Sequence, residues 1–451
     1  MRKIMSMFCF LILLAGCSKF LDKKPNQSLS VPDDLSDLQM LMDEVNKING
    51  EDPNALIMAA DEMYISLQAL DAVGYLEKEM YTWDPDEVFM VDSDRWVWGI
   101  KYSHIFRANL ILENLDRIKR KPGDEAEWKN VKGQALFLRA RSYFLLANIF
   151  TLQYDPATAS TTLGLPLRLE ADFNQPTRRH TLQQTYDRII ADLKEAIELL
   201  PDRPLVVLRS SKPAAQALLA RVYMSMRDYE NCLKYANDCL AIKDDLIDYN
   251  GGEGIAQGGT YAFTRFHPEV IFESLALPAS SFYYATVDSV LYDSYNDDDL
   301  RKTMFFAGRS PIVPFKGNYA STAGSHFSGH ATDEVFLMRA ECLARKGQTA
   351  AALTDLNHLL VRRWKTGTFV PFTAATAEEA LDLILLERRK ELVFRGVRWM
   401  DLKRLNKEGR NIELVRNLDG QIYRLAPNDL RYAMAIPKDI IQMTGIAQNP
   451  R

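Results

Sequence analysis

The sequence predicts a mainly α-helical protein, in which a tetratricopeptide-like scaffold of paired helices carries a loop-rich face and a few short strands. Three observations predict this fold class. Apolar residues recur at helical spacing over several long segments. A short helical motif recurs three times, which indicates stacked helix pairs. Residues 60–95 and 243–331 lack helical spacing and are rich in aromatic residues, so we expect them to form the loop-rich face.

The N-terminus has the pattern of a bacterial lipoprotein signal peptide. Arg2 and Lys3 supply positive charge, and residues 4–14 form an apolar run that is too short to span a bilayer. The Leu-Ala-Gly before Cys17 is similar to a lipobox, where the signal is cut and the cysteine is acylated. We therefore expect residues 1–16 to be removed and Cys17 to carry a lipid anchor. The alternative is an ordinary signal peptide beside an incidental cysteine.

Net charge and cysteine spacing limit the possible partners. The net charge of -5 argues against nucleic-acid binding, which needs a basic surface. Cys232 and Cys239 lie about two helical turns apart, which is too far for a disulfide bond. No two cysteines have the CxxC spacing that is typical of a zinc site. We expect Cys232, Cys239 and Cys342 to be small buried side chains, and we expect neither a metal nor a cofactor.

The first elements follow the signal peptide. Residues 18–60 mix polar residues and prolines with a short helical pattern, which predicts a tether followed by a helix. Residues 74–95 read as a loop-rich segment with many aromatic side chains. A long helix should follow over residues 96–118, because Trp98 and Tyr102 begin a stripe of side chains that share one face.

Three copies of one motif define the scaffold. Residues 138–143 read LRARSY, residues 218–223 read LLARVY and residues 338–343 read MRAECL. A short turn and a second helix follow the second and third copies, as in tetratricopeptide pairs. Each copy carries an alanine that lets paired helices approach closely: Ala140, Ala220 and Ala340. Because such units cannot bury their faces alone, we expect the copies to pack into one scaffold.

Two segments separate the copies. A helix over residues 181–200, with Thr181 as its N-cap, should lie between the first and second copies. Residues 243–331 lie between the second and third copies and contain a cluster of glycines followed by many aromatic residues. Only residues 270–273 are typical of a strand. A segment of this length without helical spacing is usually functional.

The C-terminal stretch over residues 381–404 predicts an amphipathic helix, a break at Gly396 and a second helix that buries Trp399. Its polar face carries Glu387 and Glu391, which lie one turn apart among arginines and lysines. The two carboxyls of a glycosidase would have to flank a bond in a cleft. We therefore interpret these two glutamates as members of structural ion pairs.

The residue order in this stretch resembles the C-terminal signature of the SusD/RagB family of surface lipoproteins. The similar elements are Glu-Arg-Arg-x-Glu-Leu-x-Phe and then Gly-x-Arg-Trp-x-Asp-Leu-x-Arg. Other similar motifs occur in the family's order, including Cys-Ser-x-Phe-Leu-Asp after the lipobox, Gly-Leu-Pro-Leu at 164–167 and Ala-Ile-Pro at 435–437. One position departs from the pattern, because Arg395 stands where the family usually has an acidic residue.

The resemblance implies an outer-membrane lipoprotein that is anchored through Cys17 and exposed at the cell surface. It implies an N-terminal SusD-like part over residues 17–226 and a C-terminal RagB/SusD part over residues 227–451. It also implies that the protein captures a glycan or oligosaccharide and closes, as a lid, over a SusC-like TonB-dependent transporter, without catalysis. The alternatives are a peptide-binding member of the family, an anchored helical scaffold that binds only protein, and an anchored hydrolase.

Two groups of residues have some character of a metal site. Asp293 and the aspartates at 297–299 lack the glycine and the terminal glutamate of an EF-hand loop. His326 and His330 have a spacing that can ligate a metal on a helix, but they lie among serines and glycines with no third ligand in view. We expect neither group to bind a metal.

Aromatic side chains in the predicted loops are the candidates for ligand contact. A sugar ring has an apolar C–H face, on which indole and phenol rings can stack, and a hydroxyl rim that polar groups can bind. The predicted ligand-binding residues are Trp83, Trp96, Tyr283, Tyr284, Tyr292 and Tyr295. The alternative for each ring is ordinary packing, and aromatic rings do not distinguish a glycan from a peptide.

Overall fold

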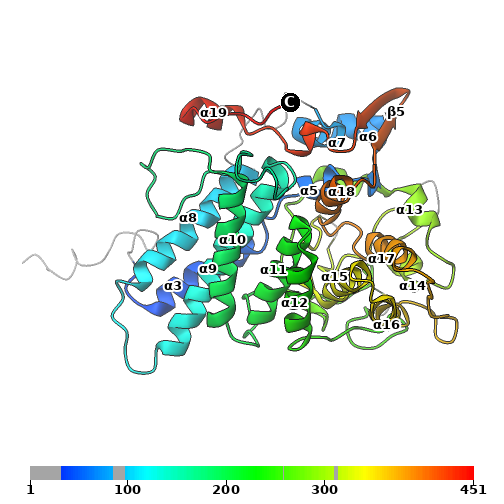
Figure 1. Ribbon diagram of the computed structural model, residues 1–451, viewed down its shortest axis with the longest axis horizontal. Helices are drawn as coiled ribbons and strands as arrows, with labels where there is room; N and C mark the ends of the chain where they lie inside the picture. The colour runs from blue at the N-terminus through cyan, green and yellow to red at the C-terminus, as the bar shows by residue number, and fades with distance from the viewer. Residues whose placement is uncertain (1–31, 85–96, 257–258, 309–312, 323) are drawn as a thin grey trace, which may run out of the picture.

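The structure is a computed structural model that describes residues 32–84, 97–256, 259–308, 313–322 and 324–451. Long helices stand side by side in a row, which confirms the predicted helical-repeat scaffold (Figure 1). Neighbours in the row pack together: α9 with α8 and α10, α10 with α11, α11 with α12, α12 with α15, and α15 with α16 and α17. Their bounds are Val97–Leu115 (α8), Glu125–Phe150 (α9), Leu182–Leu199 (α10), Lys212–Met226 (α11), Tyr229–Leu240 (α12), Thr332–Arg345 (α15), Thr349–Leu360 (α16) and Ala377–Glu391 (α17).

Small residues and helix caps explain this packing. The three alanines of the repeated motif, Ala140, Ala220 and Ala340, are fully buried, as expected of residues that let helices approach closely. The helix α9 lies at the centre of its neighbours, because every side chain over residues 133–150 is buried. Thr181 caps α10 as predicted: its side chain accepts the N–H of Gln184, whose side chain in turn accepts the N–H of Thr181.

A second layer of short elements lies along the upper edge of the row of long helices in Figure 1. The helix α5 joins the two layers, because it packs against α7, α9 and α18. Segments from the beginning and the end of the chain therefore share one layer. The elements of this layer are Ala55–Met58 (α5), Leu67–Ala72 (α6), Tyr75–Thr82 (α7), Arg398–Lys407 (α18), Leu414–Leu418 (β5), Gln421–Leu425 (β6), Leu430–Tyr432 (η5) and Lys438–Thr444 (α19).

The remaining elements are short. The described strands form three antiparallel pairs, β1 with β3, β2 with β4 and β5 with β6, which confirms the prediction of a few short strands. The helix α3 packs against α8 and α9. The bounds are Leu35–Met42 (α3), Val45–Ile48 (α4), Met63–Tyr64 (β1), Val270–Phe272 (β2), Ser280–Tyr283 (η4), Thr286–Val287 (β3), Ser289–Asp293 (α13), Leu300–Phe305 (α14) and His330–Ala331 (β4).

The described part of the segment 243–331 contributes many of its aromatic side chains to the main core. Phe263 lies at the centre of a group of buried rings, with its ring centroid 5.1 Å from that of Tyr249 and 4.9 Å from that of Tyr319. Phe305 and Phe306 extend this group. Most aromatic residues of the predicted loop face are therefore packing residues, and only a few stay in water.

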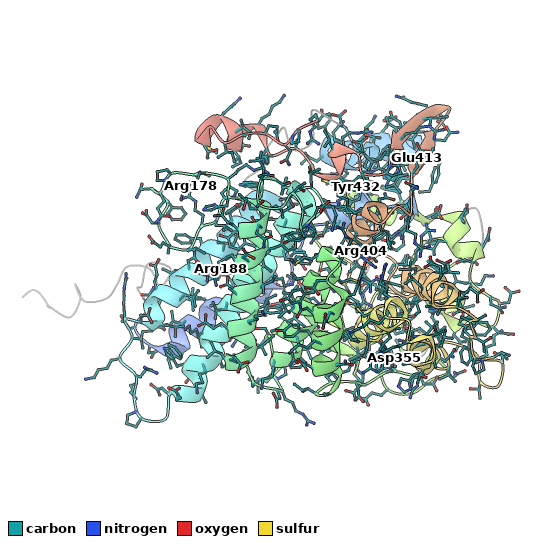
Figure 2. All side chains as sticks on the ribbon, viewed as in Figure 1. Arg178, Arg188, Asp355, Arg404, Glu413 and Tyr432 are labelled. Atoms are coloured by element: carbon teal, nitrogen blue, oxygen red, sulfur yellow. The ribbon has the colours of Figure 1, made fainter. Side chains whose placement is uncertain are left out.

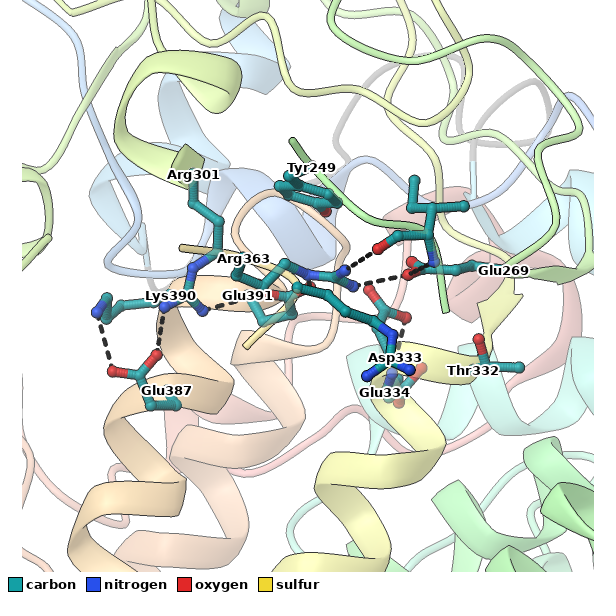
Figure 3. Close-up of polar contacts among 12 residues, drawn as sticks. Tyr249, Glu269, Arg301, Thr332, Asp333, Glu334, Arg363, Glu387, Lys390 and Glu391 are labelled. Carbon is teal, nitrogen blue, oxygen red and sulfur yellow. Dashed lines mark hydrogen bonds and ion pairs between the residues drawn. The ribbon is translucent and has the colours of Figure 1, made fainter. Parts of the chain in front are cut away.

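Buried ion pairs join the same segment to α17 (Figure 3). The guanidinium of Arg301 contacts Glu387 and donates to Glu391 at 3.0 Å. The guanidinium of Arg363 donates to Glu391 at 2.7 Å and to Glu269 at 2.8 Å. All five side chains are almost completely buried. The structural interpretation of Glu387 and Glu391 is confirmed.

Arg395, the position that departs from the family pattern, has a local explanation. Its guanidinium donates to Asp333 at 3.1 Å and lies 4.6 Å from the ring centroid of Tyr319 and 4.5 Å from that of Phe327. Because α15 supplies the carboxylate and two rings cover the cation, a basic residue fits this buried position.

The remaining packing predictions also hold. Trp399 is fully buried, and its ring centroid lies 4.7 Å from that of Tyr432, which is labelled in Figure 2. Gly396 has a φ of 71°, a conformation that favours glycine, at the break between α17 and α18. Cys232, Cys239 and Cys342 are buried thiols. Among the described helices, none combines the length and the apolar character that a membrane crossing would need.

Candidate functional site

Four tyrosines with exposed rings lie on segments that the structure holds together, and we call them the tyrosine face. Tyr283 and Tyr284 are 65% and 55% exposed, and Tyr64 and Tyr75 are 44% and 46% exposed. They come from η4 and the residue after it, from β1 and from the start of α7. Sequence reasoning identified Tyr283 and Tyr284 as ligand candidates. It missed Tyr64 and Tyr75, because neither the strand pairing nor the α7 contact can be deduced from local sequence.

Backbone pairing connects these segments. Tyr64 pairs with Thr286 in the β1–β3 ladder, which places Tyr284 two residues away along the chain. The carboxylate of Glu77 in α7 accepts the N–H groups of Ser280 at 3.0 Å and Ser281 at 2.7 Å. The backbone ladder therefore holds β1 to β3, and the Glu77 side chain holds the first turn of α7 to η4.

Packed rings support the tyrosine face from inside. The His326 ring centroid lies 4.3 Å from that of Phe282 and 5.4 Å from that of Phe394, with the His326 and Phe394 rings stacked. Burial lowers the pKa of His326 to about 3, so this imidazole is neutral at ordinary pH. Gly324 lies against Tyr283, since a Cβ there would come within 2.7 Å of the Tyr283 hydroxyl oxygen. Because His326 is neutral and packs against Phe282 and Phe394, we interpret it as a packing ring.

Trp83 is not part of this surface, and its expected place in an exposed loop is wrong. The helix α7 continues to Thr82, and Trp83 caps it in a left-handed conformation with a φ of 55°. This turn directs the indole inward, where its N–H donates to the carbonyl oxygen of Ala59 at 2.9 Å. Trp83 is only 4% exposed, and the Arg416 guanidinium lies 4.5 Å from its ring centroid. A ring covered in this way presents no face to a ligand.

The other predicted residues lie elsewhere. Tyr295 is 2% exposed, and its hydroxyl donates to the carbonyl oxygen of Lys390 at 2.7 Å, so the structure places it in the core. Burial raises the pKa of Tyr295 well above its usual value. Tyr292 is half-buried against Phe306, and the ring centroids of the two residues lie 5.6 Å apart. Trp96 and the predicted lipidation site, Cys17, lie outside the described residues.

A cleft lies apart from the predicted residues, and we call it the α8 cleft. It has a volume of about 340 Å³ and lies between α8, the loop over residues 166–177 and α19. Sequence reasoning assigned its α8 side chains to packing, and their periodic spacing gave no signal of a cavity. Its main apolar lining residues are Trp98, Tyr102, Phe106, Pro166, Phe173 and Ile440.

The described residues show no group of three or more histidine, cysteine or acidic side chains arranged to hold a metal ion. His326 and His330 are buried; burial lowers the pKa of His326, and burial together with nearby arginines lowers that of His330. The tyrosine face and the α8 cleft are formed mainly by phenyl, phenol and indole rings beside a few polar groups.

Comparison with known proteins identifies the family. A family model described as "Starch-binding associating with outer membrane" matches residues 19–224, and the SusD family model matches residues 332–439. The two matched ranges lie in order and together cover most of the chain. The protein belongs to the SusD family.

Relatives of this SusD-family protein match it in sequence or in structure over most of its length. SusD-like protein P2 of Formosa agariphila is 26% identical over 368 residues, which are 68% of this chain and 71% of the relative. A SusD superfamily structure from Bacteroides thetaiotaomicron has 21% identity and a TM-score of 0.75, and covers 92% of this chain and 100% of that one. Another, from Bacteroides vulgatus, has 22% identity and a TM-score of 0.76, and covers 92% and 98%. These two structures establish the fold.

The family matches divide the tyrosine face. Tyr64 and Tyr75 lie within the first matched range, whereas Tyr283 and Tyr284 lie between the two ranges, in the segment 243–331. The family description associates its members with starch binding and with the outer membrane. The half of the face that neither family model covers is the half with the most exposed rings.

Proposed function

We propose that this SusD-family protein captures an oligosaccharide at the cell surface and delivers it, as a lid, to a SusC-like TonB-dependent transporter. The ligand leaves the protein chemically unchanged. The observation that carries this proposal is the tyrosine face, because its exposed rings stand on supports fixed by the β1–β3 ladder and by the Glu77 carboxylate. Clustered exposed apolar surface marks an interaction site, since folding alone favours its burial.

Phenol rings suit a sugar ligand for a physical reason. Each ring offers an apolar face for the C–H side of a pyranose, and each hydroxyl can donate to or accept from the sugar rim. Several rings on rigid supports can contact successive units of a chain without a large loss of conformational entropy. The starch-binding description of the family supports the same class of ligand. Tyr283 and Tyr284 are the residues we propose to contribute most.

We also propose that the mature protein begins at an acylated Cys17 after removal of residues 1–16. Several acyl chains on one cysteine would form a durable anchor to the outer membrane. The association of the family with the outer membrane supports this location. On this account residues 17–226 and 227–451 act together as one ligand-presenting body, with the transporter as protein partner and no nucleic acid involved.

Affinity electrophoresis tests the ligand class directly. Purified protein is run in gels that contain soluble starch, and in parallel gels with other neutral polysaccharides or without polysaccharide. We expect retardation by at least one neutral polysaccharide, which a Tyr283→Ala/Tyr284→Ala double variant should reduce. Normal mobility in every gel, together with binding to a library of short peptides, would overturn the proposal in favour of a peptide-binding protein.

A further inference from the structure

The α8 cleft is open to solvent although its floor is largely apolar. Trp98, Tyr102 and Phe106 lie on one face of α8, at successive intervals of four residues, and line the cleft together with Phe173. Ile440 of α19 forms part of the opposite wall. A volume of about 340 Å³ is at the lower end of the range for small-molecule sites, which matches one or two sugar rings.

Phe173 gives this cleft an exposed ring. Its side chain is 79% exposed, and its ring is stacked on that of Phe106, with a centroid separation of 4.2 Å and an interplanar angle of 22°. One face of the ring is therefore supported from below, whereas the rest of the residue stays largely in water. A ring held in this position is a platform for an apolar ligand face.

The loop that carries Phe173 is held by side chains of the scaffold, of which Asn109 and Tyr143 are fully buried. The side-chain amide of Asn109 donates to the carbonyl oxygens of Arg168 at 3.0 Å and Glu170 at 3.2 Å. The hydroxyl of Tyr143 donates to the carbonyl oxygen of Arg168 at 2.8 Å, and Glu113 accepts the N–H of Ala171 at 2.6 Å. The platform is thus positioned before binding, which lowers the entropic cost of capturing a ligand.

Polar groups of both signs line the cleft above the apolar floor. Arg168 donates to the carbonyl oxygen of Gln175 at 2.6 Å, and Glu170 and Asp172 lie on the same loop. Glu170 accepts a hydrogen bond from the Gln175 side chain, Asp172 accepts the N–H of Asn174 at 2.8 Å, and within the described residues neither carboxylate forms an ion pair. Each carboxylate keeps further lone pairs that can accept hydrogen bonds from sugar hydroxyls, and its negative charge repels carboxylated or sulfated sugars. The rim therefore favours an uncharged, hydroxyl-rich ligand.

We propose that the α8 cleft is a second binding site, which takes one or two neutral pyranose units against Phe173 and the α8 rings. This inference rests on the proposed oligosaccharide-binding function and adds a site that involves neither Tyr283 nor Tyr284. Such a site would hold part of a glycan independently of the tyrosine face.

Calorimetric titration in two backgrounds tests the second site. The probes are neutral hexasaccharides of glucose, mannose and xylose, and the tightest binder to the wild-type protein is used throughout. The Tyr283→Ala/Tyr284→Ala variant should retain weak binding. Adding Phe173→Ala should weaken that residual binding about tenfold, as expected for the loss of one stacked ring. Adding Phe173→Trp should preserve it, and adding Leu169→Ala, at an exposed position of the same loop, should leave it unchanged.

The outcomes separate this inference from the proposed function. If the wild type binds a hexasaccharide but the residual binding is absent or insensitive to Phe173→Ala, the second site is refuted and the tyrosine face stands. If the wild type binds no neutral hexasaccharide, both proposals fail. Trigalacturonate should bind the double variant at least tenfold more weakly than the neutral probe does. Tighter binding of trilysine than of the neutral probe would instead make the α8 cleft a peptide site and overturn the inference.

Discussion

At the scale of single residues, the burial of Trp83 makes it a stability determinant. Its indole is 4% exposed and donates to the carbonyl oxygen of Ala59. We expect Trp83→Ala to lower the free energy of unfolding by about 3–5 kcal/mol, because it removes a large buried side chain and leaves a cavity. Tyr283→Ala, which removes an exposed ring, should change it by less than about 0.5 kcal/mol. Chemical denaturation of both variants measures the difference, and equal stabilities would contradict the buried placement of Trp83.

Glu62 predicts a pH dependence of stability. Burial raises its pKa to about 8, and the neighbouring Asp61 carboxylate adds to the effect, although Arg398 and Arg389 oppose it. Between about pH 4.5 and pH 8, the folded protein holds a proton on Glu62 that the unfolded chain has lost. This group therefore makes the free energy of unfolding fall as the pH rises through that window, by about 1.4 kcal/mol per pH unit at most.

A Glu62→Gln variant isolates this effect, because glutamine has the same shape and does not titrate. We expect the variant to be more stable than the wild type at pH 8 and to lose most of that advantage at pH 5. Urea denaturation at several pH values provides the measurement. If wild type and variant show the same slope of stability against pH, the folded-state pKa of Glu62 is not raised.

Residues differ in how well sequence alone predicts their place. The burial of Trp399 and the N-cap role of Thr181 follow from local periodicity and capping rules, and both hold in the structure. Trp83 and Tyr295 were misplaced, because each turns into a core built by distant segments: Trp83 bonds to Ala59, and Tyr295 bonds to Lys390. The residues next to Trp83 and Tyr295 in the sequence do not reveal which distant residues they will contact.

At the scale of elements, buried ion pairs attach the segment 243–331 to α17. Arg363 joins Glu391 of α17 to Glu269 and also donates to the carbonyl oxygen of Ile247 at 2.8 Å. Removing this cation leaves carboxylates buried without full compensation. We expect Arg363→Met to lower the free energy of unfolding by about 3–5 kcal/mol.

The matched control is Arg410→Met, which breaks exposed pairs with Glu378 and Asp382. Exposed ion pairs contribute little, so we expect a loss below about 1 kcal/mol. Thermal or chemical unfolding of the two variants gives the comparison. A small effect of Arg363→Met would show that the segment is held by its aromatic core alone.

Elements also differ in predictability. Long helices such as α9 and α17 carry several turns of periodic side chains, so their existence follows from sequence. The two residues of β1 do not, because their strand conformation depends on pairing with β3, more than 200 residues away. The α8 cleft escaped prediction for a related reason, since its walls come from α8, the 166–177 loop and α19.

At the scale of the whole molecule, the lipid anchor on Cys17 stays a prediction, because Cys17 lies outside the described residues. Cys17→Ala should abolish acylation, because the acyl chain needs the thiol. We expect the variant to lose labelling by a radioactive fatty acid and to leave the membrane fraction. Replacing the nearby Ser18 by alanine is the control and should change neither result. Unchanged labelling and fractionation of the Cys17 variant would rule out this anchor.

The central claim concerns the whole molecule: a rigid helical scaffold presents exposed tyrosines, from segments far apart in sequence, to a glycan. The most direct test is calorimetric titration of the Tyr283→Ala/Tyr284→Ala variant with the polysaccharide that retards the wild type, together with its melting temperature. The control is Leu205→Ala/Val206→Ala, at exposed apolar side chains outside the face. The account predicts at least tenfold weaker binding by the tyrosine variant alone, with melting temperatures unchanged in both. Wild-type affinity in the tyrosine variant would contradict it.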